Sequence, residues 1–76
     1  MIDIYAQIEN NVKQFVMEEL AKAKKANNNP TINVLNCKAV AYGALQFASN
    51  YCFPCYNYDL AEWWVKEVCP EFQKLL

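Results

Sequence analysis

The chain of 76 residues contains no arginine and no histidine, and it has only one glycine, one serine and one threonine. All seven basic residues are therefore lysines, and the net charge is −1. Without the arginine fork that grips phosphates and guanine edges, and without a basic surface, we expect no nucleic-acid partner. Without histidine, the common Ser/His and Cys/His catalytic pairs and the commonest metal ligand are missing. We therefore expect a protein that is not an enzyme and needs no cofactor.

Long hydrophobic runs are also missing. The longest stretch of small and apolar residues, 39–45, is far shorter than the ~20 residues that span a bilayer. Charged residues interrupt the first twenty positions, which disfavours a signal peptide. We expect a cytoplasmic protein with no membrane partner, whose four cysteines stay reduced. The abundance of Asn, Lys and Tyr without Arg is typical of AT-rich genomes, and small proteins of this kind are common in phages and mobile elements, so we expect a phage or mobile-element protein.

What the chain does contain is apolar and aromatic residues. Hydrophobic residues make up 55% of the sequence, aromatic residues 14% and charged residues 20%, a composition that excludes disorder. The shortage of glycine disfavours a turn-rich all-β domain. A chain this short buries only a little over ~60% of the surface that its unfolded form exposes. We predict one all-α domain over residues 1–76, a small three-helix bundle that dimerisation completes.

The first predicted helix is long and amphipathic. Apolar residues recur at a mixed spacing of three and four along the first third of the chain, which predicts a helix over about 3–26. Glu9 with Lys13 and Glu18 with Lys22 stand four residues apart on the remaining surface. Such pairs stabilise a solvated helix face.

The second predicted helix is apolar on nearly every side. It follows an Asn-rich turn over 27–30 that ends in a proline, and it extends over about 31–51. Its polar exceptions form one narrow line: Asn36, Gly43, Gln46 and Asn50. A helix this apolar is usually contacted from two sides, so a second copy of the chain is predicted as a further wall of the core.

The third predicted helix is short. A turn over 52–58 leads into a helix over about 59–69, where Asp59 and Glu62 match a capping box. A proline then either ends this helix or starts a short C-terminal turn over 70–76.

Four cysteines are the first group that could carry chemistry. Cys52 and Cys55 have the spacing of a metal knuckle or of a redox dithiol. Cys37 and Cys52, on one helix, would lie about 22 Å apart, which excludes a single site made of all four thiolates. Antiparallel helices instead predict two pairs, Cys52 with Cys55 and Cys37 with Cys69. The alternatives are cysteines that only pack in the core, and a metal or thiol-redox role for Cys52 and Cys55.

Aromatic residues around the second turn are the other candidates. Tyrosine and tryptophan are enriched where proteins bind each other, and two adjacent tryptophans on a helix point about 100° apart, so both cannot face one core stripe. Our leading hypothesis is a non-catalytic helical protein-interaction module that forms a homodimer and can also present this surface to another protein. The residues predicted to contact a partner are Tyr56, Tyr58, Trp63 and Trp64.

Overall fold

The structure is a computed structural model that describes residues 3–25 and 30–76, and it is built from helices alone in those residues. Its elements are α1 (Ile4–Lys24), α2 (Pro30–Tyr51), α3 (Tyr58–Trp63), the π-helical segment η1 (Trp64–Val68) and α4 (Cys69–Lys74). The last three follow one another without a break and form a single rod. The predicted all-α, three-helix bundle is confirmed. Most of the predicted turn over 27–30 lies outside the described residues.

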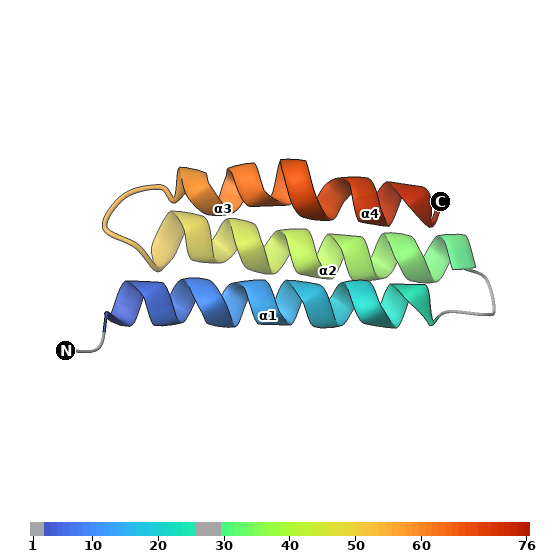
Figure 1. Cartoon of the computed structure of the whole chain (residues 1–76), viewed down its shortest axis with the longest axis horizontal. Helices are drawn as coiled ribbons and strands as arrows, with labels where there is room; N and C mark the ends of the chain where they lie inside the picture. Colours follow the sequence, from blue (N-terminus) through green and yellow to red (C-terminus); the bar gives the residue numbers. More distant parts are fainter. Residues whose placement is uncertain (1–2, 26–29) are drawn as a thin grey trace.

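The three rods run alternately up and down. Figure 1 shows α2 between α1 and the rod of α3, η1 and α4, with the two chain ends at opposite ends of the molecule. The bundle is elongated, with dimensions of 45 × 19 × 18 Å. The predicted antiparallel packing of the second and third helices is therefore present.

The starts of the first two helices follow from their sequences. The Asp3 carboxylate accepts hydrogen bonds from the backbone N–H groups of Tyr5 and Ala6, at 3.0 and 3.2 Å, and so caps α1. α2 begins at Pro30, whose fixed φ suits the first turn of a helix and whose missing N–H is not needed there.

One of the two predicted ion pairs on α1 is present and the other is replaced. Lys13 Nζ lies 3.5 Å from Glu9 Oε1, as predicted. Lys22 pairs with Glu19, at 3.0 Å, and not with Glu18. The Glu19 side chain is largely buried, so an ion pair with Lys22 also partners a carboxylate that has lost most of its water.

The third rod begins earlier than the capping box predicts. Its N-cap is Asn57, whose Oδ1 accepts the backbone N–H of Leu60 at 3.0 Å. Asp59 is therefore the second helical residue, where its charge lies near the positive end of the helix dipole. The Glu62 side chain reaches forward to Lys66 rather than back to the cap. The predicted capping box is wrong, because Asn57, two residues before Asp59, provides the side-chain acceptor.

The third rod also continues past its proline. Within η1 the helix widens, and the Cys69 N–H donates to the Trp64 carbonyl, five residues back. In a regular α-helix the Pro70 ring would clash with the carbonyl four residues earlier, and the wider turn avoids that clash. The chain therefore passes into α4 instead of ending its helix at Pro70.

The widened turn also keeps one row of side chains in the core. On a regular α-helix, side chains four residues apart drift by about 40° at each step, so a long row turns away from the core. The π-helical turn in η1 contains more residues than an α-helical turn, so side chains four residues apart rotate less around the helix axis. The row is fully or nearly fully buried and has a strict spacing of four: Leu60, Trp64, Val68 and Phe72.

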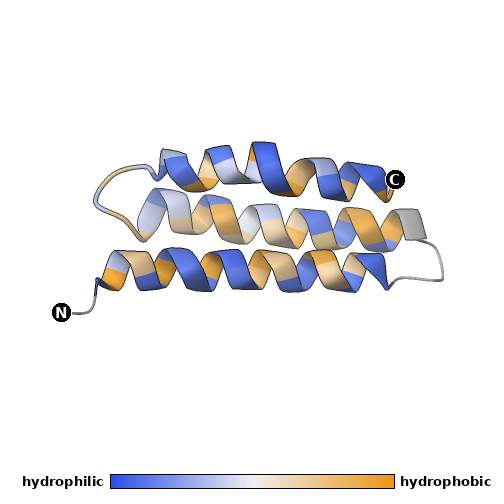
Figure 2. Ribbon diagram, viewed as in Figure 1, coloured by the Kyte–Doolittle hydropathy of each residue, from blue (hydrophilic) through white to orange (hydrophobic). Residues whose placement is uncertain are grey.

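The core runs along the axis where the three rods meet. Figure 2 shows hydrophobic residues alternating with hydrophilic ones along α1, and a paler, less hydrophilic α2. Besides the row above, the largest fully buried side chains come from α1 and α2: Val16, Leu20, Val34 and Leu45. Ser49 is also fully buried, and its Oγ has no hydrogen-bond partner among the described residues.

Candidate functional site

The two adjacent tryptophans have different environments. Trp64 is 5% exposed, and its ring centroid lies 5.1 Å from that of Tyr42 and 5.8 Å from that of Phe72. Trp64 is therefore a core residue, which removes it from the residues predicted to contact a partner. Trp63 is half-buried, and Lys13 Nζ lies 5.4 Å from the centroid of its ring, a cation–π contact with α1.

The other two predicted contact residues lie at the end of the bundle, around the second turn. The rings of Tyr56 and Tyr58 meet edge to face, with centroids 4.9 Å apart. Tyr56 is half-buried and its hydroxyl donates to Gln46 Oε1, whereas Tyr58 is 76% exposed. These rings form a small exposed cluster that is separate from the core.

The four cysteines are free thiols with different surroundings. Cys37 is half-buried beside Glu19 of α1, and burial, together with that carboxylate, raises the pKa of its thiol. Cys69 lies in a groove between α2 and α4. Cys52 is half-buried and Cys55 is exposed at the turn. A thiol with a raised pKa is a weak nucleophile, because the thiolate is the reactive form.

A metal site would require several ligands that converge. In residues 3–25 and 30–76, no three His, Cys, Asp or Glu side chains gather in a way that could hold a metal ion. Cys52 and Cys55 could supply two sulfur ligands of the four that a closed zinc site needs.

An exposed apolar surface along α1 and α2 escaped the sequence analysis. We call it the α1–α2 face, and its residues are Ile4, Ile8, Val12 and Phe15 of α1 and Val40, Ala44, Phe47 and Tyr51 of α2. On each helix, residues three and four positions apart share one side. Phe47 is 62% exposed and Tyr51 76% exposed, and their rings form a tilted pair with centroids 5.2 Å apart.

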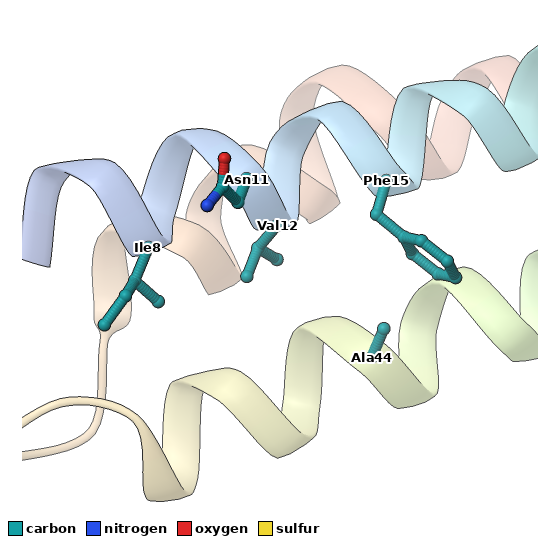
Figure 3. A pocket seen from close by; sticks show the side chains of 5 residues that line it. All are labelled: Ile8, Asn11, Val12, Phe15 and Ala44. Carbon is teal, nitrogen blue, oxygen red and sulfur yellow. The ribbon is translucent and has the colours of Figure 1, made fainter.

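The centre of the α1–α2 face is hollow. A depression of about 280 Å³ is lined by Ile8, Asn11, Val12, Phe15 and Ala44. Figure 3 shows the side chains of Ile8, Val12 and Phe15 projecting from α1 toward α2, with the Ala44 methyl group pointing back at them. Because alanine is small, α2 leaves this space unfilled. A bulky exposed side chain, Phe47, lies one helical turn away on the same helix.

Comparison of the chain with protein-family models, with curated proteins and with solved structures finds no match. Among the described residues, α2 and the other helices all fall short of the length and apolar character needed to cross a membrane.

Proposed function

We propose that this protein is a small, non-catalytic interaction module that self-associates through the α1–α2 face. The observation that carries the proposal is the apolar stripe along both helices, with Phe47 62% exposed one helical turn from the central depression. A monomer that leaves large aromatic side chains in water loses the favourable free energy of burying them. A second copy that covers the stripe recovers it.

The exposed apolar area of the α1–α2 face is close to the area that a small dimer interface buries. An aromatic side chain buries about 200 Å² when it is fully covered. Phe15, Phe47 and Tyr51 are 39%, 62% and 76% exposed, so they leave roughly 350 Å² per chain. Ile4 and Val40, 60% and 50% exposed, bring the total to roughly 500 Å² per chain. Two copies therefore offer about 1,000 Å² before the rim is counted, close to the ~1,200 Å² of a small stable interface.

The α1–α2 face is also complementary in shape to the same face of a second copy. In a two-fold dimer the same patch meets its own copy, so a protrusion on the patch must face a depression on it. A two-fold axis that crosses α2 between Ala44 and Phe47 sets each Phe47 ring opposite the hollow above Ala44 of the partner. Gly43 beside them does not oppose this approach, since a methyl group added there would meet no atom within 4 Å.

The α1–α2 face contains no charged residue, so two copies can approach without repulsion across its centre. Apolar contacts are insensitive to ionic screening, whereas charge-driven association weakens as salt increases. Self-association through this face is therefore expected to persist from low to high salt.

The test is the solution mass of the reduced protein, measured by light scattering over a concentration series. We expect a concentration-dependent dimer for the wild type and a monomer for Phe47→Glu, which puts a charge on the face beside its central depression. The matched control is Tyr58→Glu, since Tyr58 is similarly exposed but lies in the turn cluster. Circular dichroism establishes that each variant stays helical.

The control also separates the two aromatic surfaces. We expect Tyr58→Glu to dimerise like the wild type. A wild type that is monomeric at every concentration contradicts the proposal. So does a dimer that Tyr58→Glu breaks and Phe47→Glu leaves intact, since that result would place the interface at Tyr56 and Tyr58.

A further inference from the structure

A second groove lies on the other flank of α2, between α2 and the third rod. It has a volume of about 490 Å³ and is lined by Leu35, Lys38, Ala39, Tyr42, Trp64 and Cys69. This volume falls within the range of ~300–1,000 Å³ that is typical of small-molecule sites, which are mostly apolar with a few polar groups. None of its lining residues belongs to the α1–α2 face. A ligand here therefore leaves that face free.

The walls of this groove are apolar and partly uncovered. Trp64 is held in place by its ring contacts with Tyr42 and Phe72, and as a 5% exposed residue it lines the groove with only a small part of its surface. Leu35 and Tyr42 remain exposed on α2, although the groove is close to the core. An apolar chain in the groove would cover these walls and displace water from them.

Lys38 is the charged residue of this lining, and it has no ion pair in the part of the chain that the structure describes. Lys13, Lys22, Lys66 and Lys74 each pair with a carboxylate of their own helix. Lys38 is half-buried and forms no ion pair within residues 3–25 and 30–76. The remaining positions of the chain, 1–2 and 26–29, contain no acidic residue that could neutralise it.

We propose that this groove binds a small apolar molecule that ends in a carboxylate, such as a medium-chain fatty acid. The alkyl chain lies along the apolar walls beside Trp64, and the Lys38 ammonium donates to the carboxylate. A hydrogen bond between two charged groups is stronger than one between neutral groups, particularly where water is partly excluded. The site therefore selects for negative charge as well as for hydrophobicity. This proposal goes beyond self-association and does not depend on it.

The test uses three probes with long alkyl chains that differ in their head group: dodecanoate and dodecyltrimethylammonium, kept below their micelle concentrations, and dodecanol, kept below its solubility limit in water. Binding is followed by tryptophan fluorescence in a Trp63→Phe background, where Trp64 is the only indole. We expect dodecanoate to bind about tenfold more tightly than dodecanol, and the cation to bind most weakly. Circular dichroism checks that the background variant is folded.

Two substitutions locate the site. Lys38→Gln should remove the preference for dodecanoate over dodecanol, while Lys24→Gln, at an exposed lysine on α1, should keep it. Ala39→Phe places a large ring in the groove from its α2 wall and should weaken the binding of all three probes. The proposal is overturned if dodecanoate does not bind at millimolar concentration, or if its advantage over dodecanol survives Lys38→Gln. Light scattering on the same samples reports self-association independently.

Discussion

Replacement of Asn57 by alanine should destabilise the protein more than replacement of Asp59. The Asn57 side chain accepts the N–H of Leu60 at 3.0 Å, and Leu60 itself is fully buried. Loss of an N-cap costs about 0.5–2 kcal/mol, and this partly buried site favours the upper half of that range. In a domain of this size, each kilocalorie lowers Tm by roughly 4–8 °C. We therefore expect Asn57→Ala to lower Tm by roughly 5–16 °C.

Asp59→Ala is the matched variant, because the sequence pattern alone makes Asp59 the cap. In the structure its side chain is exposed in the first turn of α3, where a negative charge contributes only about 0.3–1 kcal/mol through the helix dipole. Thermal unfolding by circular dichroism, at one low protein concentration, compares the two variants with the wild type. A larger loss of Tm for Asp59→Ala than for Asn57→Ala would refute the assignment of the cap.

Other predictions concern the core and the thiols. Phe72→Ala removes a fully buried ring and should cost about 3–5 kcal/mol in urea unfolding, a large share of the stability of so small a domain. Ser49→Ala removes a buried hydroxyl without a partner in the described residues and should raise Tm; a lower Tm would show that the hydroxyl is bonded. Iodoacetamide, followed by mass spectrometry, should modify exposed Cys55 well before Cys37. The Cys37 pKa is raised by folding, so the unfolded chain ionises first and stability should fall above about pH 8.5. Cys37→Ala should reduce this loss of stability at high pH.

The first two helices could be predicted from sequence because their signals are local. The spacing of apolar residues sets the extent of α1, and Pro30 marks the start of α2. The bounds of the third rod were harder to predict from the sequence. Asn57 and Asp59 are both good caps, and only the path of the chain out of the second turn decides between them. Pro70 normally ends a helix, and the strict spacing of four from Leu60 to Phe72 is the one sequence signal of the widened turn that accommodates it.

The candidate surfaces could not be ranked from sequence. Because α2 is apolar on nearly every side, its sequence does not show which side α1 covers and which side stays exposed. The sequence therefore did not distinguish Phe47 from the buried residues of α2, and partner contacts were predicted at the aromatic residues around the second turn instead. The packing of the helices shows which of the two adjacent tryptophans is buried. The Trp64 indole faces α2 and is buried, whereas Trp63 lies beside Lys13.

The most direct test of the central claim is an isotope-filtered NMR experiment on a mixture of labelled and unlabelled protein, which detects contacts only between different copies. If two copies meet through the α1–α2 face, we expect intermolecular NOEs between the Phe47 ring and the Ala44 methyl group. A dimer whose intermolecular NOEs arise only from Tyr56 and Tyr58, or a sample with none at millimolar concentration, would contradict it.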